Sequence, residues 1–103
     1  MAAERRRHQR VAYPIEGSWH GASGGSACRI GDLSLGGCFI YARAVATTGE
    51  RAEISMRVGD EDLRFPGFVV HIDPAMGFAV EFRELTPEQR NQIQQILDAL
   101  ARS

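Results

Sequence analysis

Hydrophobic and polar positions alternate along most of the chain between residues 11 and 82. The alternation is clearest in Arg51–Val58, where every second residue is apolar, and a looser form runs from Val11 to Trp19. A period of two is typical of β-strands with one buried face. It predicts four further short strands, over Ala27–Ile30, Cys38–Ala42, Leu63–Ile72 and Gly77–Phe82.

Turn-forming residues separate these segments. Gly21–Ser26 is predicted to be a flexible hairpin connection, and Gly59–Asp62 and Asp73–Met76 to be turns. Pro14 suggests an edge position or a bulge in the first strand, and Pro66-Gly67 suggests a bulge in a later one. Six short strands joined by tight turns predict an antiparallel barrel or a sandwich.

The period changes from two to 3.6 near the C-terminus. Thr86 and Gln89 form a capping box with a proline between them, which is typical of a helix start. The apolar residues that follow fall on one face of a helix: Ile93, Ile96, Leu97 and Leu100. We therefore expect a helix over residues 86–102 that packs on the strands.

A length of 103 residues suits one domain, which we divide into a flexible Arg-rich arm (1–9) and a folded domain (10–103). The chain has no apolar run of the ~20 residues that a membrane span needs, so we expect a cytoplasmic protein that does not bind membranes. Cys28 and Cys38 are too few for a zinc site, and we expect both to be buried thiols without a disulfide.

Catalytic chemistry lacks support in the sequence. All twelve basic residues are arginines, which excludes Schiff-base lysines and a lysine-containing phosphate loop. His8, His20 and His71 are scattered without metal-ligand spacing, and we expect His71 to be half-buried in its strand. We expect neither an enzyme nor a metal site.

Two short motifs carry candidate binding chemistry. Arg6 and Arg10 are four residues apart just before the first strand, and Asp32, Ser34 and Gly37 form a D-x-S-x-x-G motif between two strands. Guanidinium groups bind phosphates and match the O6/N7 edge of guanine. A carboxylate can accept hydrogen bonds from the opposite guanine edge, and a glycine lets the backbone approach closely. Together the motifs predict a nucleotide site, although each alone is also typical of a solvated tail or a polar turn.

In their order and spacing, these motifs and the Gly77–Phe82 strand make the chain resemble the PilZ domain family of bacterial receptors for cyclic di-GMP. The resemblance implies a mainly β fold, a six-stranded antiparallel β-barrel with a C-terminal α-helix. It also implies that cyclic di-GMP is the ligand, with no other cofactor. The implied ligand-binding residues are Arg6, Arg10, Asp32, Ser34 and Gly37, with Arg5, Arg7 and Gly36 as secondary positions.

The implied function is a receptor that signals when the ligand orders the N-terminal arm and an unidentified downstream protein recognises the result. We expect a monomer or a ligand-dependent dimer. The alternative is an adaptor that binds protein without ligand. Binding to nucleic acid polymers is not expected, because six aromatic residues that could line a groove lie in strands that need a core: Phe39, Tyr41, Phe65, Phe68, Phe78 and Phe82.

Overall fold

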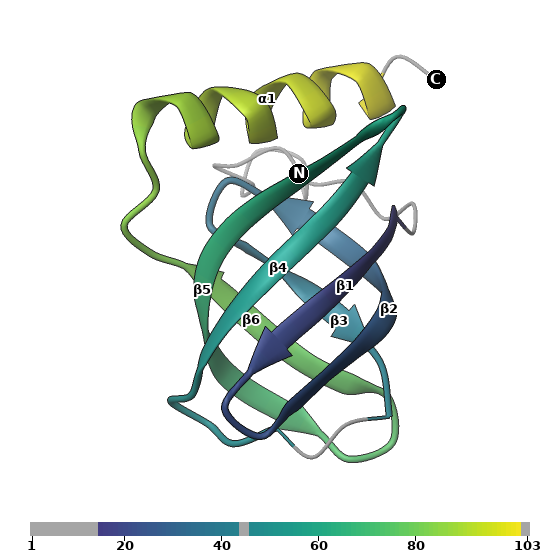
Figure 1. Cartoon of the computed structure of the whole chain (residues 1–103), viewed down its shortest axis with the longest axis vertical. Helices are drawn as coiled ribbons and strands as arrows, with labels where there is room; N and C mark the ends of the chain where they lie inside the picture. The colour runs from purple at the N-terminus through teal and green to yellow at the C-terminus, as the bar shows by residue number, and fades with distance from the viewer. Residues whose placement is uncertain (1–14, 44–45, 102–103) are drawn as a thin grey trace, which may run out of the picture.

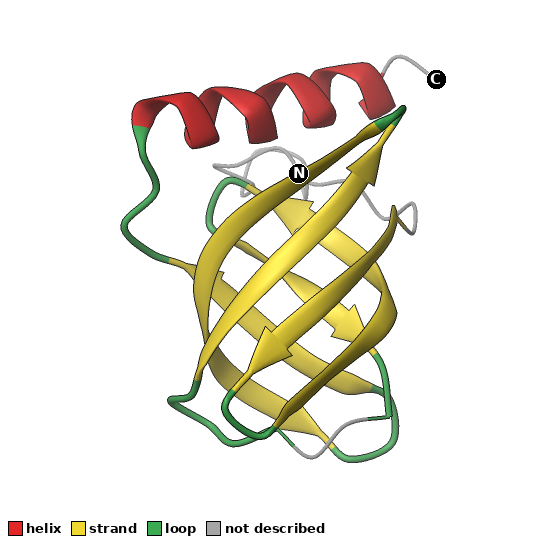
Figure 2. Cartoon of the chain, in the orientation of Figure 1, coloured by secondary structure: helices red, strands yellow, loops and turns green. Residues whose placement is uncertain are grey.

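The fold is a closed β-barrel with a helix across one end (Figures 1 and 2). It was analysed as a computed structural model that describes residues 15–43 and 46–101. Within these residues six antiparallel strands close in the order β1-β2-β3-β6-β5-β4, which confirms the barrel. The strands are β1 (Ile15–Gly21), β2 (Gly24–Ser34), β3 (Gly37–Tyr41), β4 (Arg51–Val58), β5 (Glu61–Asp73) and β6 (Gly77–Phe82), and the helix is α1 (Pro87–Ala101).

The first hairpin is tighter than its sequence suggests. Its turn consists of Ala22 and Ser23 alone, and Gly24–Ser26 already pair with residues of β1. The predicted hairpin is confirmed, but its extent over Gly21–Ser26 is wrong, because the backbone ladder of a hairpin forms without large side chains. Pro14, with the bulge or edge position predicted for it, lies outside the described residues.

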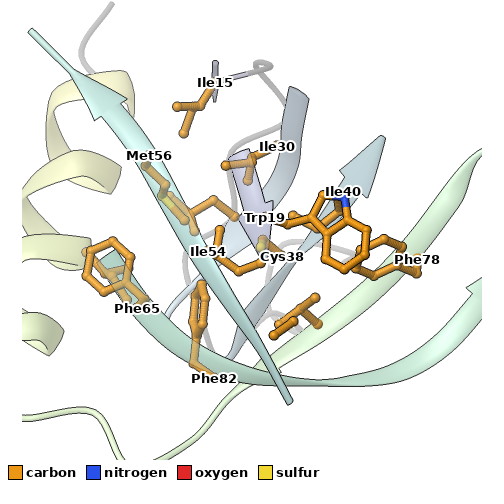
Figure 3. Packing of buried hydrophobic residues seen from close by; sticks show 14 of the residues in the cluster. Ile15, Trp19, Ile30, Cys38, Ile40, Ile54, Met56, Phe65, Phe78 and Phe82 are labelled. Atoms are coloured by element: carbon orange, nitrogen blue, oxygen red, sulfur yellow. The ribbon is translucent and has the colours of Figure 1, made fainter. Parts of the chain in front are cut away.

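The core lies inside the barrel, where the alternating apolar residues meet (Figure 3). In β4 the residues Ala52, Ile54 and Met56 are fully buried, as their period of two predicts. Trp19 of β1 packs edge-on against Phe78 of β6, with ring centroids 5.1 Å apart. Such an edge-to-face contact is a favourable geometry for two aromatic rings.

Three of the six aromatic residues between Phe39 and Phe82 do not belong to this core. Phe65, Phe78 and Phe82 are buried, but Phe39 and Phe68 are only partly buried and Tyr41 is 37% exposed. The expectation that all six fill the core is wrong. Odd and even positions of a strand face opposite sides, so aromatics out of phase with the core lie on the outer wall. His71 is likewise exposed rather than half-buried.

Strand β5 contains its irregularity elsewhere than predicted. Pro66 and Gly67 pair in regular register with Glu53 and Ala52 of β4, so the predicted bulge at these residues is wrong. The register with β6 shifts instead between Val69 and His71. The Pro66 carbonyl faces β6 and accepts from Arg83 N at 3.3 Å, one residue beyond the last paired residues of β5 and β6. The position of the missing Pro66 N–H faces the same side, where no ladder hydrogen bond requires it, so the proline is tolerated.

The helix α1 begins where the capping box predicts. Gln89 N donates to Thr86 Oγ1 at 3.0 Å, and Thr86 N donates to Gln89 Oε1 at 2.9 Å. Thr86 is therefore the N-cap rather than the first helical residue. The buried residues of α1 are Ile93, Ile96 and Leu97, and they join the core of the barrel, which confirms that the helix packs on the strands.

Candidate functional site

The D-x-S-x-x-G motif forms the hairpin that joins β2 to β3. Asp32 and Ser34 are the last residues of β2 on one face, Leu35 and Gly36 form the turn, and Gly37 begins β3. The motif is thus mostly strand, not a loop between strands. Its local irregularity is a register shift between Gly31 and Ser34, where β2 has more residues than β3. A bulge of this kind re-aims side chains at the end of a strand.

The bulge separates the motif into inward and outward positions. Leu33 is fully buried in the core, whereas Asp32 is exposed. Asp32 has a φ of 48°, in the left-handed region that aspartate occupies more easily than most residues. The backbone thereby directs the carboxylate to the outer wall of the barrel while Leu33 anchors the turn beneath it.

The Ser34 hydroxyl spans the turn. Its Oγ accepts from Gly36 N at 3.2 Å and donates to Gly37 O at 3.5 Å. This is the local bonding that a serine in a polar turn typically makes. Ser34 therefore shapes the turn, and its oxygen can still accept a further hydrogen bond from a ligand.

Gly37 is required by the pairing of β3 with β6. A Cβ at this position would collide with Val80 O of β6, so no other residue fits without a shift of the backbone. The adjacent Gly36 O accepts from Phe82 N at 2.9 Å. The motif turn is thus fixed against the end of β6 by its main chain.

The motif residues line a shallow hollow of about 390 Å³ on the outer wall. Asp32, Ser34, Gly36 and Gly37 come together there, so the structure unites the four predicted site residues that it describes. The other lining residues come from β3, β5 and β6: Cys38, Phe39, Val70, Ala79, Val80 and Glu81. The hollow combines an apolar surface with carboxylates and a hydroxyl at its edge, which suits a flat polar aromatic group.

The four arginines predicted for the site, Arg5, Arg6, Arg7 and Arg10, lie outside the described residues. The point where the chain enters the barrel is described. Ile15 at the start of β1 pairs with Ile30 of β2, two residues before Asp32. The chain therefore enters the barrel next to β2, the strand that carries Asp32 and Ser34. It does so at the same end of the barrel as the motif.

A larger hollow of about 890 Å³ lies at the opposite end of the barrel, around Glu50 and the β1–β2 turn. The Glu50 carboxylate accepts hydrogen bonds from Ser23 N at 2.7 Å, Ser23 Oγ at 2.8 Å and Thr47 N at 2.9 Å. These bonds hold the loops of the chain together. Size alone therefore does not identify the binding site.

The two cysteines are free thiols, as expected, but only Cys38 is buried, so the expectation of burial is wrong for the half-buried Cys28. Burial raises the pKa of Cys28 to about 11 and raises the pKa of the fully buried Cys38 further, with a contribution from Cys28. Thiols with raised pKa values stay protonated and unreactive at neutral pH. Within residues 15–43 and 46–101, no group of three or more His, Cys, Asp or Glu side chains could hold a metal ion.

Neither Glu81 nor the apolar residues of the hollow were predicted from the sequence. Cys38 and Phe39 belong to β3 itself, and the pairing of β3 with β6 and of β6 with β5 brings the others beside the motif. The alternation in Gly77–Phe82 could have placed Glu81 on the outer face. No local signal shows which strands are neighbours.

Comparison with known proteins agrees with this geometry. The model of the PilZ domain family matches residues 4–99. The chain belongs to the PilZ domain family. This confirms the resemblance inferred from the two motifs. Among curated proteins, none matches the chain.

Solved PilZ structures share the fold. The PilZ domain of YcgR from Escherichia coli, solved with cyclic di-GMP, has a TM-score of 0.73 at 21% identity and covers 95% of this chain and 92% of its own. The structure of Escherichia coli YcgR in complex with cyclic di-GMP has a TM-score of 0.73 at 25% identity, and the match covers 95% of this chain and 46% of YcgR. The Bacillus subtilis inhibitor of motility has a TM-score of 0.71 at 15% identity, and the match covers 92% of this chain and 50% of that protein. This chain thus spans about half the length of the last two proteins.

Family membership also bears on catalysis. The PilZ family is a family of cyclic di-GMP receptors and not a catalytic family, in agreement with the expectation that this chain is not an enzyme. Among the residues that the structure describes, no helix has the length and apolar character needed to cross a membrane.

Proposed function

We propose that this PilZ domain is a cytoplasmic receptor that binds cyclic di-GMP in the hollow beside the β2–β3 turn. The observation that carries the proposal is the convergence of four motif residues on one hollow: Asp32, Ser34, Gly36 and Gly37. The hollow is close to the point where the chain enters the barrel, because Ile15 pairs with Ile30, two residues before Asp32 in β2. The arginines of the preceding segment supply the positive charge that a ligand with two phosphates requires.

In the proposed complex, Arg6 and Arg10 bind the phosphates and the O6/N7 edge of guanine. The Asp32 carboxylate accepts hydrogen bonds from the opposite edge of a guanine. Ser34 and Gly37 shape the turn so that the ligand can approach the backbone, and Arg5, Arg7 and Gly36 contribute at the edge of the site.

The binding proposal is tested by calorimetry with cyclic di-GMP, using cyclic di-AMP and GTP as controls. Loss of one charge-assisted hydrogen bond costs about 1.5–3 kcal/mol, so Arg6→Ala, Arg10→Ala and Asp32→Ala should each weaken binding about 10- to 100-fold. Asp32→Ala should also reduce the preference for guanine over adenine. Wild-type affinity in all three variants would refute the proposed site.

The signal is proposed to come from ordering of the N-terminal arm. Residues 1–9 carry three of the proposed site residues, Arg5, Arg6 and Arg7, and few apolar groups, so the ligand would supply most of the contacts that order them. The ordered arm and the ligand then form a surface for a downstream protein. Amide exchange of residues 4–10 should slow when cyclic di-GMP saturates the protein, and unchanged exchange at saturation would disprove the switch.

A further inference from the structure

Gly37 separates two polar side chains on the outer wall. In the paired register, Ser34 of β2 lies opposite Gly37 on one side and Glu81 of β6 lies opposite it on the other. Neighbouring strands are about 4.8 Å apart, so Ser34 and Glu81 are roughly 10 Å apart with only the glycine between them. This row forms a slot in the hollow, with Asp32 and Ser34 on one wall and Glu81 on the other.

The floor of the slot is apolar. Ala79, Phe39 and Val70 line it, and Val70 is 42% exposed. An apolar floor accommodates the flat face of a base, while a carboxylate at the wall accepts hydrogen bonds from its edge. Guanine has two adjacent donors on one edge, N1–H and the N2 amine, which match the two oxygens of one carboxylate.

Arg83 fixes the Glu81 carboxylate. Its Nε donates to Glu81 Oε1 at 2.7 Å, and its guanidinium lies 4.6 Å from the centroid of the Phe68 ring. Phe68 is the β5 partner of Glu81 in the register, and Arg51 lies over the same ring at 5.1 Å. Arg83 is thus held by both an aromatic ring and a carboxylate, and its charge offsets that of Glu81 near a ligand with two phosphates.

This ion pair has little to do with folding. The side chains of Arg83 and Glu81 are 49% and 51% exposed. Surface ion pairs of this kind stabilise a fold by about 1 kcal/mol or less. The Glu81 carboxylate is therefore an exposed group of a residue that lines the hollow, and the fold depends little on it.

We propose that Glu81 accepts hydrogen bonds from the N1 and N2 donors of a guanine of cyclic di-GMP, and that Arg83 is a positioning residue for the Glu81 carboxylate. The inference rests on the proposed function. Because the ligand carries two guanines, Asp32 and Glu81 can each accept hydrogen bonds from the N1/N2 edge of a different guanine, from opposite walls of the slot. Glu81 is then a determinant of guanine specificity that lies outside both sequence motifs.

The test combines protein variants with a ligand that lacks the N2 amine. Calorimetry is performed with cyclic di-GMP and with cyclic di-IMP, whose hypoxanthine bases have no 2-amino group. Glu81→Gln should weaken binding of cyclic di-GMP about ten-fold, because a charged acceptor is lost. The same variant should discriminate less between the two ligands than the wild type, which shows coupling between Glu81 and the amine.

Glu84→Gln is the matched control, because Glu84 also pairs with an arginine, Arg51, at 3.2 Å but is not among the residues that line the hollow. It should leave both affinities unchanged. Arg83→Ala should weaken cyclic di-GMP binding about three-fold, less than loss of the carboxylate itself. Arg83→Lys should restore part of that loss, and Arg83→Ala should have no further effect once Glu81 is glutamine.

The outcomes separate the two proposals. If Asp32→Ala weakens binding but Glu81→Gln changes neither the affinity nor the discrimination between the two ligands, the inference is overturned and the proposed function stands. If the wild type does not bind cyclic di-GMP, the proposed function is overturned and the inference with it. An effect of Glu84→Gln equal to that of Glu81→Gln would also overturn the inference, since it would indicate a general charge effect.

Discussion

At the end of the barrel remote from α1, the Glu50 carboxylate is surrounded by donors from its own chain. Hydrogen bonds from Ser23 and Thr47 tie the β1–β2 turn to the segment before β4. The backbone N–H of Ser23 is the main reason why the pKa of Glu50 is lowered; burial opposes it as the second-largest effect, and further donors, led by Thr47 N, lower the pKa as well. This carboxylate stabilises the fold.

At the end that α1 covers, the β2–β3 turn is held by other means (Figure 1). Leu33 anchors it in the core, Gly36 O accepts from Phe82 N, and Gly37 allows β3 to approach β6. Main-chain and apolar contacts, together with the Ser34 hydroxyl, hold this turn, and Asp32 and Glu81 line a hollow on the outer wall.

The comparison shows how one barrel separates stability from recognition. A carboxylate whose acceptor positions are filled by backbone donors of the chain is unsuited to a ligand, however large the hollow beside it. The turn beside α1 takes its shape mainly from its main chain and from Leu33, so a change of a carboxylate that lines its hollow should affect ligand binding more than the fold. The predictions below test this division, and the first two concern the turn beside α1.

Leu33→Ala should give the largest effect. Removal of a fully buried leucine side chain costs about 3 kcal/mol through lost burial and the cavity left behind. For a domain of this size, the melting temperature should fall by roughly 15 °C. Thermal unfolding measures the change, and Leu35→Ala, at a half-buried position of the same turn, is the control. Equal losses in the two variants would show that Leu33 does not anchor the turn.

Gly37→Ala should destabilise the protein by about 2 kcal/mol, because the new methyl group forces β3 and β6 apart. Gly36→Ala has no such collision, since the nearest atom is Ser34 Oγ at 3.8 Å, and should change stability by less than about 0.5 kcal/mol. Urea unfolding distinguishes the two glycines. A similar midpoint for both variants would contradict the role of Gly37 in strand pairing.

Glu50→Gln should destabilise the protein by about 1 kcal/mol at pH 7, a small value because the carboxylate is accessible to solvent. The folded-state pKa of Glu50 is lowered, so its contribution is present above the unfolded-state pKa and is lost as the pH falls through the folded-state value. The difference between wild type and variant should therefore shrink in acid.

Urea unfolding at pH 7 and near pH 3 measures this pH dependence, with the exposed Glu53→Gln of β4 as the control. Binding of cyclic di-GMP should be unchanged in Glu50→Gln. A stability difference between wild type and Glu50→Gln that persists at low pH, or a loss of ligand affinity in this variant, would contradict the proposal that one end of the barrel serves stability and the other serves ligand binding.

Several features followed from the sequence because they depend on neighbouring residues. The alternation in Arg51–Val58 and Gly77–Phe82 gave the bounds of β4 and β6, and the Thr86–Gln89 capping box gave the start of α1. The spacing of Asp32, Ser34 and Gly37 identified the part of the site that lies on one hairpin. In each case the relevant contacts join residues a few positions apart.

The remaining features depend on contacts between distant segments. A period of two shows which residues share a face of a strand, but not which strands are neighbours. Only barrel closure placed β6 beside β3, and with it Glu81 beside Gly37. The same limit explains Phe68, whose position on the outer wall between Arg51 and Arg83 follows from its phase relative to the core. The sequence determined the hairpin and its motif, whereas the tertiary structure decided what faces that motif, because strand pairing is a property of the whole closed sheet.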